Sequence, residues 1–150
     1  MSANTVEAVV GDAVADFGRA ASKRLAGPGQ PEDQLRPPLV TLLELVGSAL
    51  GVDVAPYGET PLPDLSVRPD YAISVDGVIC GYVEVKAPGK GADPTRFKAR
   101  SHDRKQWQAL SQLPNILYTD GQETFSRMPT HRQRLRSRRW WRDLLARSWP

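Results

Sequence analysis

The chain has 150 residues, of which 40% are hydrophobic and 25% charged, an ordinary balance for one soluble globular domain. Its net charge of +3 is uneven, because residues 127–150 hold eight of the 20 basic side chains and a single acid, so the charge alone does not predict nucleic-acid binding. No apolar run approaches the roughly 20 residues of a membrane span, no secretory signal begins the chain, and there is one cysteine. We therefore expect a cytoplasmic protein without membrane association or internal disulfides.

Two helices are expected at the start of the chain. Apolar residues recur at helical spacing over residues 4–25, and Gly27-Pro28-Gly29 ends that pattern. A second stripe of Leu and Val over about residues 32–50 predicts another helix, with Gly51 as its C-terminal glycine.

The middle of the chain changes to the composition of β-strands. Residues 52–57 favour a short strand. After a Pro-rich loop, two runs rich in Val, Ile and Tyr, residues 71–75 and 78–85, flank Asp76-Gly77, which predicts a β-hairpin. The second run is apolar on both faces apart from Glu84, as is typical of a central strand.

The last elements complete an alternating order. Residues 97–113 are expected to form a polar helix, and residues 116–118 and 123–127 two further strands. This order predicts an α/β (α+β) fold with a small mixed sheet and helices against its faces.

Chemistry-bearing side chains gather around the predicted hairpin. Glu84 interrupts an apolar strand, where a carboxylate is costly unless it is paired or bound to a metal. Lys86 projects from the same face two residues later, and Asp70 begins the partner strand. Mg²⁺ binds in proteins through one or two carboxylates plus a phosphate, and a nearby cation can orient the attacking water. The three residues therefore predict a magnesium centre for phosphodiester hydrolysis.

This centre requires Asp70 and Glu84 to share one face of the hairpin. A regular hairpin with the two-residue loop Asp76-Gly77 would place them on opposite faces. We therefore expect either a three-residue loop, Val75-Asp76-Gly77, or a β-bulge near Gly81.

Pro69-Asp70 followed by Glu84-Val85-Lys86 resembles the PD-(D/E)XK nuclease motif. The stretches around it resemble, in the same order, the N-terminal nuclease domain of single-chain (type ISP-like) restriction–modification enzymes, which carry DNA methyltransferase modules. These stretches are PEDQLRPPLVTLLE, RPDYAISV, GYVEVKAPG, the helix with Lys105-Gln106, and LPNILYTDGQETF. The resemblance implies a restriction-endonuclease-like core of order α-β-β-β-α-β within residues 1–126, and Mg²⁺-dependent cleavage of DNA.

The resemblance also implies a metal-binding set. Asp70 and Glu84 would be metal ligands, and the Val85 carbonyl would be a further one. Glu32, on the second helix, would bind the metal or a water next to it, although an acid at a helix start is also favoured by the helix dipole. The expected ion is Mg²⁺, with Mn²⁺ able to take its place.

Two further residues receive roles from the resemblance. Lys86 would position the nucleophilic water, and Gln106 would lie beside that lysine or the scissile phosphate. The expected partner is double-stranded DNA, together with methyltransferase or helicase modules or subunits; a homodimer is left open.

The resemblance stops where the Arg-rich tail, residues 127–150, begins. One interpretation is a basic arm that grips DNA and stacks Trp140, Trp141 and Trp149 on bases. Another is a short helix over residues 136–147 that packs on the domain. We favour a third, an out-of-frame continuation of a longer enzyme, because the charge changes abruptly there.

Two functions other than an active endonuclease stay open. A catalytically inactive DNA-binding fragment of a larger restriction–modification enzyme would keep the fold and bind DNA in a salt-dependent way without cutting it. A basic RNA-binding protein would depend on the tail. Methyltransferase activity is not expected from these residues, because the chain has no glycine-rich cofactor loop and no Asn-Pro-Pro-Tyr-like motif.

Overall fold

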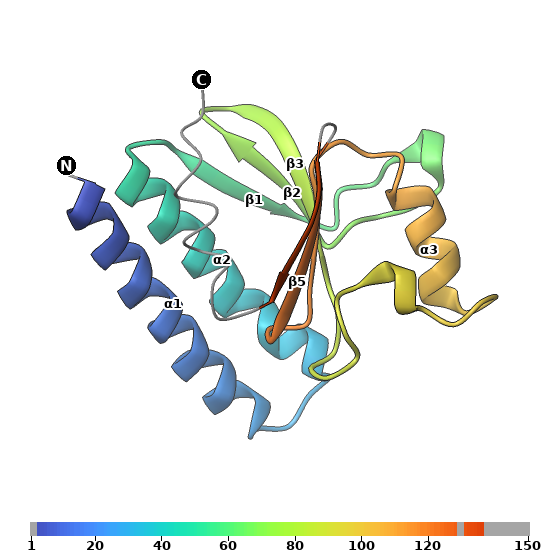
Figure 1. Ribbon diagram of the computed structural model, residues 1–150, viewed down its shortest axis with the longest axis horizontal. Coiled ribbons are helices and arrows are strands. Elements are labelled where there is room, and N and C mark those ends of the chain that lie inside the picture. Colours follow the sequence, from blue (N-terminus) through green and yellow to red (C-terminus); the bar gives the residue numbers. More distant parts are fainter. Residues whose placement is uncertain (1–2, 129–130, 137–150) are drawn as a thin grey trace.

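The computed structural model describes residues 3–128 and 131–136 (Figure 1). Its helices are α1 (Ala3–Leu25), α2 (Pro31–Leu50) and α3 (His102–Leu110). Its strands are β1 (Val54–Gly58), β2 (Tyr71–Val75), β3 (Val78–Val85), β4 (Ile116–Thr119), β5 (Glu123–Met128) and β6 (His131–Arg136), and short 3₁₀ turns lie at Pro63–Leu65 and Pro94–Arg96.

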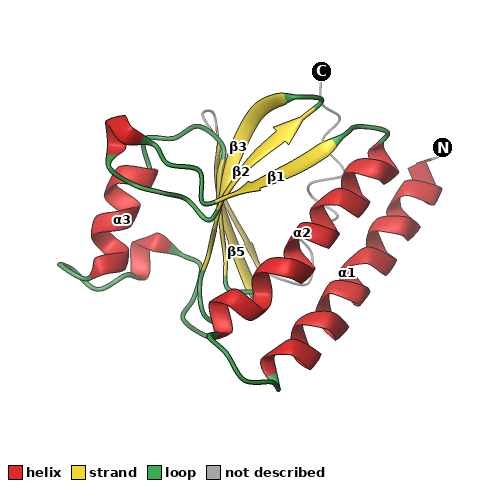
Figure 2. Ribbon diagram, turned by 180° about the vertical axis from the view of Figure 1, so that it is seen from behind, coloured by secondary structure: helices red, strands yellow, loops and turns green. Residues whose placement is uncertain are grey.

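Within these residues the strands form one six-stranded sheet in the order β1-β2-β3-β4-β5-β6. All neighbours are antiparallel except β3 and β4, which are parallel and are connected through α3. Helices α1 and α2 lie side by side on one side of the sheet, and α3 lies on the other (Figures 1 and 2). The expected mixed sheet flanked by helices is confirmed.

The two N-terminal helices begin and end close to where the sequence predicted. Helix α2 starts at Pro31, whose missing N–H costs nothing in the first turn, and ends at Gly51 in the left-handed conformation, with φ of 76°. Its buried Leu35, Leu39 and Leu42 pack against α1 and the sheet in one apolar cluster. None of the helices in the described residues combines the length and apolar character that a bilayer crossing requires.

The β2–β3 hairpin differs from the expected three-residue loop. Val75 pairs directly with Val78, so the loop is the two residues Asp76-Gly77. Both adopt positive φ, 49° and 82°, as a tight primed turn requires. The alternative, a bulge near Gly81, is confirmed: the register shifts between Ile73 and Ser74, opposite Cys80. The shift restores the parity that a two-residue loop alone would have broken.

Helix α3 is shorter than the predicted helix over residues 97–113, because it begins five residues later and ends three residues earlier. Phe97 is extended and Arg100 has a φ of 67°, so the helix begins only at His102. Ser101 caps it by accepting a hydrogen bond from the N–H of Arg104 at 3.2 Å. The cap at Ser101 and the turn at Pro94 therefore override the helical pattern of residues 97–101 and set the start of α3.

The C-terminal strands extend the sheet. Strands β4 and β5 were expected, whereas β6 was not, and it pairs with β5 from Glu123↔Arg136 to Met128↔His131. The sheet thus runs across the boundary that the sequence placed after residue 126. The division into a core and a tail stays a prediction, since residues 137–150, with the three tryptophans and almost all of the suggested helix, lie outside the described part of the chain.

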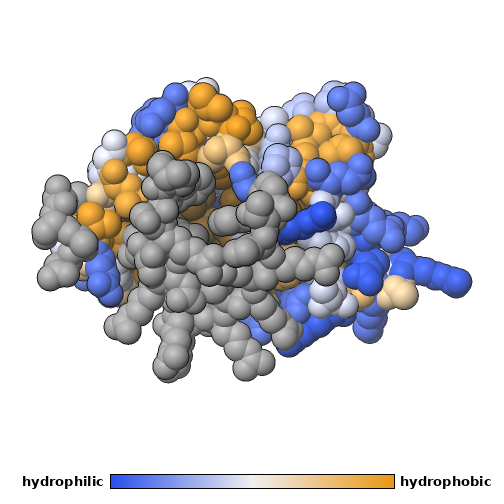
Figure 3. All heavy atoms as spheres, turned by 45° about the horizontal axis from the view of Figure 1, so that its top comes forward, coloured by the Kyte–Doolittle hydropathy of each residue, from blue (hydrophilic) through white to orange (hydrophobic). Residues whose placement is uncertain are grey.

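Strand β3 separates two environments. Val83 and Val85 point into the apolar cluster made with α1 and α2. Tyr82 points the other way, into a second cluster with Trp107 and Leu110 of α3, and Glu84 shares that face. In Figure 3 the side of the molecule that carries α3 presents mostly hydrophilic side chains. Glu84 and Gln106 therefore lie on the α3 side of the sheet, whereas Glu32 belongs to α2 on the other side.

Candidate active site

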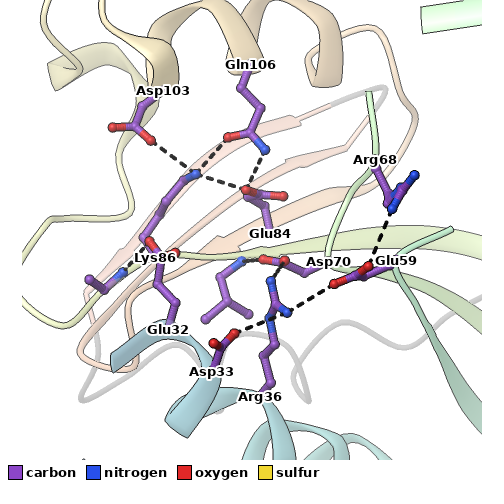
Figure 4. A network of polar contacts seen from close by, with 12 residues as sticks. Glu32, Asp33, Arg36, Glu59, Arg68, Asp70, Glu84, Lys86, Asp103 and Gln106 are labelled. Carbon is purple, nitrogen blue, oxygen red and sulfur yellow. Dashed lines mark hydrogen bonds and ion pairs between the residues drawn. The ribbon is translucent and has the colours of Figure 1, made fainter. Parts of the chain in front are cut away.

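The candidate site lies where β2 begins and β3 ends, between the N-terminal turns of α2 and α3 (Figure 4). The register Tyr71↔Val83, continued by one residue, places Asp70 opposite Glu84 on the same face of the sheet. Lys86 follows directly after β3. The structure therefore brings together the three residues on which the sequence argument depended.

Glu84 and Lys86 form one half of the site together with Gln106 of α3. Lys86 Nζ donates to Glu84 Oε1 at 2.9 Å and to Gln106 Oε1 at 2.8 Å. Gln106 Nε2 in turn donates to the same Glu84 Oε1 at 2.7 Å. Gln106 thus lies beside the lysine, one of its two expected places, while Glu84 Oε2 is buried without a hydrogen-bond partner among the described residues.

Asp103, in the first turn of α3, completes the surroundings of Lys86. Its Oδ1 lies 3.3 Å from Lys86 Nζ, and its Oδ2 lies 3.1 Å from the ammonium of Lys90. Burial opposes the charge of Lys86, but the carboxylates of Glu84 and Asp103 outweigh burial and raise the lysine pKa above its ordinary value. Lys86 is therefore a protonated cation here, suited to orient a water or offset negative charge rather than to accept a proton.

Asp70 forms the other half of the site. Its Oδ1 accepts a hydrogen bond from Arg36 Nη2, and its Oδ2 accepts one from the N–H of Val85 at 2.7 Å. The N–H of Lys86 points the opposite way, to Thr119 of β4. Because the N–H and C=O of one strand residue face the same side, the Val85 carbonyl faces the edge where Asp70 lies.

The surroundings of the Asp70 and Glu84 side chains disfavour the charged form of both carboxyl groups. Burial raises the pKa of Asp70, although the Val85 N–H and Arg36 counteract it. Burial and the neighbouring charge of Asp70 raise the pKa of Glu84, with Lys86 acting against them. Two buried carboxylates whose pKa values are both raised favour a bound cation that would neutralise them.

Glu32 lies at the edge of this network. Its Oε1 accepts a hydrogen bond from the N–H of Ala87 at 3.0 Å, which ties α2 to the residue after Lys86. Its observed contact is therefore to the backbone that carries the lysine, and its expected role next to a metal stays a prediction.

Tyr118 of β4 lies next to Glu84 in the parallel β3–β4 register, on the same face. Its ring lies under Lys86, with 5.8 Å from the ammonium to the ring centroid, and its hydroxyl is buried without a hydrogen-bond partner in the described part of the chain. Burial, followed by the charges of Glu84, Asp103 and Asp70, raises its pKa well above the ordinary value. Tyr118 is thus a neutral, fully buried side chain that packs beneath Lys86 and Glu84.

The oxygen donors of the site fit Mg²⁺, an ion that needs only a few ligands from the protein. No group of three or more His, Cys, Asp or Glu side chains within the described residues is arranged to hold a metal. Mg²⁺, however, is commonly bound by one or two carboxylates with waters and substrate phosphate. The unpartnered Glu84 Oε2, the facing Asp70 and the Val85 carbonyl are oxygen donors of that kind.

Three residues of the site were missed by the sequence analysis, namely Arg36, Asp103 and Tyr118. Arg36 lies one helical turn after Glu32, so helical spacing already placed the two on one face of α2. Asp103 lies three residues before Gln106 in the same way, but the misplaced start of α3 concealed that it occupies the first turn. Nothing in the local pattern distinguished Tyr118 from an ordinary strand residue.

Comparison with known proteins shows a likeness in fold but none in sequence family. No protein-family model matches the sequence, and no curated protein matches it. The fold is similar to that of a solved chain described as "cryoEM structure DrdV-DNA complex", with a TM-score of 0.63 and 18% sequence identity over 90% of this chain and 94% of that chain. At this identity the likeness shows the fold alone, and that fold is consistent with the expected restriction-endonuclease-like core.

Proposed function

We propose that the protein is a Mg²⁺-dependent DNA endonuclease of restriction–modification type, with Asp70, Glu84 and Lys86 as its active residues. The observation that carries the proposal is the pairing of Asp70 with Glu84 at the end of a hairpin, where Glu84 Oε2 is buried and unpartnered. The fold agrees with it, because the similar solved chain belongs to a complex with DNA. The motif resemblance supplies the reaction class, hydrolysis of a phosphodiester bond.

Each residue has a definite task in this proposal. Asp70 and Glu84, with the Val85 carbonyl, would hold Mg²⁺, which supplies positive charge to the scissile phosphate and acidifies a water. Lys86, kept protonated by Glu84 and Asp103, orients that water and offsets the negative charge that develops on the phosphate. Gln106 fixes the lysine in place through its side-chain carbonyl.

The surface around the site supports an extended anionic substrate. The segment between β1 and β2 separates two hollows of about 550 and 450 Å³. The first is lined by Asp70 and Arg36, and the second by Gln106, so both reach the candidate site. Arg68 lines both hollows, and Lys105 lines the second. These cations lie where a DNA backbone leaving the site would pass.

One observation favours a second candidate, the catalytically inactive DNA-binding fragment of a larger restriction–modification enzyme. Arg36 already occupies Asp70 Oδ1, and both oxygens of that carboxylate are engaged within the chain. If the guanidinium holds that position permanently, DNA would bind but not be cut. Partner methyltransferase or helicase modules, or a second copy of the chain, would then be needed for activity.

The test is cleavage of supercoiled and linear duplex DNA by the full chain, with and without Mg²⁺. The proposal expects Mg²⁺-dependent cutting with 5′-phosphate ends, and a rate lowered by about a hundred- to a thousandfold in Lys86→Ala. Lys90→Ala is the matched control, because Lys90 contacts the same Asp103 but is about half exposed, and none of the described contacts joins it to Glu84. Cutting that persists in Lys86→Ala would refute the proposed role, and salt-dependent binding without cutting would favour the inactive fragment.

A further inference from the structure

Arg36 occupies one of the two oxygens that Asp70 could offer to the proposed metal. Its Nη2 donates to Asp70 Oδ1, while the other Asp70 oxygen is engaged by the Val85 N–H. A divalent ion bridging Asp70 and Glu84 would therefore have to compete with the guanidinium, since both cations seek the same carboxylate.

The guanidinium is only partly satisfied where it lies. Its Nε is buried without a hydrogen-bond partner among the described residues. A second nitrogen, Nη1, lies 3.3 Å from Asp33 Oδ1 and 3.6 Å from Glu59 Oε1. Both of those acids are more than half exposed, and neither contacts Glu84. Arg36 is thus already in ionic contact with two other acids, which would hold the guanidinium if it left Asp70 (Figure 4).

There is also room for the guanidinium to move in this way. The hollow of about 550 Å³ between α2 and the β1–β2 segment is lined by Arg36, Glu59 and Asp70 together. A guanidinium moving from Asp70 toward Glu59 stays within one open space and never loses ionic contact.

We propose that Arg36 is a displaceable counter-cation, which covers Asp70 in the ion-free protein and transfers to Asp33 and Glu59 when a divalent cation binds. The inference rests on the proposed function, because it takes Asp70 and Glu84 as the metal ligands. It adds that Arg36 sets the affinity of the site for the ion, and that Asp33 and Glu59 are the acids that receive the arginine.

The test is the affinity of the full chain for Mn²⁺. It is measured by electron paramagnetic resonance and by calorimetry, at about pH 8 and near-physiological salt. Arg36→Gln is expected to bind Mn²⁺ roughly tenfold more tightly than the wild type, because the competing charge is gone. Arg68→Gln is the charge-matched control. Arg68 pairs with the same Glu59 and lines the same hollow, but the described contacts do not join it to Asp70, so its variant should change binding by no more than about twofold.

A second variant tests the transfer in the opposite direction. Asp33→Asn combined with Glu59→Gln removes both receiving acids and should weaken Mn²⁺ binding several-fold, because Arg36 is left with Asp70 alone. Both side chains are largely exposed, so this variant tests the inference even if Arg36→Gln fails to fold. A Ca²⁺-loaded crystal structure should show the guanidinium on Asp33 and Glu59.

The outcomes separate this inference from the function on which it rests. If no protein of the series binds Mn²⁺, the proposed function and the inference both fail. If the wild type binds Mn²⁺ and Glu84→Gln does not, but Arg36→Gln binds no more tightly than the wild type, the inference alone fails. A Ca²⁺-loaded structure with Arg36 still on Asp70 would overturn it as well.

Discussion

The C-terminal end of strand β3, together with Lys86 directly after it, presents two faces that are buried to the same degree but have opposite chemistry. Val83 and Val85 each expose 2% of their surface and meet α1 and α2 through hydrocarbon alone, whereas Glu84 and Lys86 expose 3% and 4% on the α3 side. Alternation along a single strand thus separates an apolar core from a buried charged network. Equal burial, however, does not mean an equal contribution to the stability of the fold.

The energetic argument supports this division. Burying a Val or Leu side chain stabilises a fold by about 1.5–3 kcal/mol. A buried ion pair gives little net stabilisation, because desolvation offsets the attraction between its charges. The α3 face, moreover, leaves Glu84 Oε2 and the Tyr118 hydroxyl unpartnered within the described residues. Such an arrangement is better explained by a ligand that the side chains bind than by stability.

The largest expected effect on stability comes from the apolar face. Leu42→Ala should lower the free energy of unfolding by about 2–5 kcal/mol, because Leu42 is almost fully buried between α1, α2 and the sheet. Leu45→Ala is the control on the same helix, and should cost well under half as much because Leu45 is 41% exposed. Urea denaturation measures both, and equal losses would show that this face is not the stabilising core described above.

The sequence predicted the elements of this fold better than their registration. Periodicity and turn residues are local, so α1, α2 and both hairpin strands were placed within two residues of their observed bounds. The bulge depends on a contact distant in the chain: Asn115 donates from its side chain to the Cys80 carbonyl, and a Cβ at Gly81 would come within 2.8 Å of the Asn115 carbonyl. No pattern near residue 80 records that neighbour.

The same distinction explains which site residues were found. Asp70, Glu84 and Lys86 could be predicted because they lie on one hairpin with recognisable spacing. Arg36 and Asp103 come from helices on opposite sides of the sheet, and only the packed structure places them on Asp70 and Lys86. Side chains that hold a charged group in place are thus harder to predict than the charged group itself, since their role depends on tertiary distance.

An intermediate effect concerns stabilisation of the charged face by metal. Saturating Ca²⁺ should stabilise the wild type by about 1.5–3 kcal/mol, a rise in Tm of several degrees. Because the pKa values of Asp70 and Glu84 are raised, protons compete with the ion as the pH falls toward those pKa values. The Ca²⁺-induced rise in Tm should therefore be larger at about pH 8 than at about pH 5.

The raised pKa values of Asp70 and Glu84 also make the stability of the ion-free protein depend on pH. A carboxyl whose folded pKa is raised contributes its full stability below its ordinary pKa, and that contribution is lost as the pH rises through the folded value. The ion-free protein thus loses stability from this pair on going to neutral pH, which is the loss that Ca²⁺ would restore. Glu84→Gln should abolish the Ca²⁺ effect, whereas Glu44→Gln, on the exposed side of α2, should retain it. A Ca²⁺ effect that is independent of pH, or that survives in Glu84→Gln, would argue against binding at this site.

The smallest expected effect distinguishes the two faces by DNA affinity. Arg68→Ala combined with Lys105→Ala removes two cations that line the hollows beside Gln106 and Asp70. Duplex binding should weaken by roughly tenfold, and the slope of log affinity against log salt should fall by about two, because each cation would neutralise one phosphate.

Lys23→Ala combined with Arg24→Ala, in the last turn of α1, is the control. It changes the net charge equally on the opposite face and should leave both quantities nearly unchanged. Fluorescence anisotropy with a labelled duplex at several salt concentrations gives both values. If both double variants weaken DNA binding equally, binding depends on the total charge of the protein. That result would contradict the assignment of the α3 face as the DNA-binding surface.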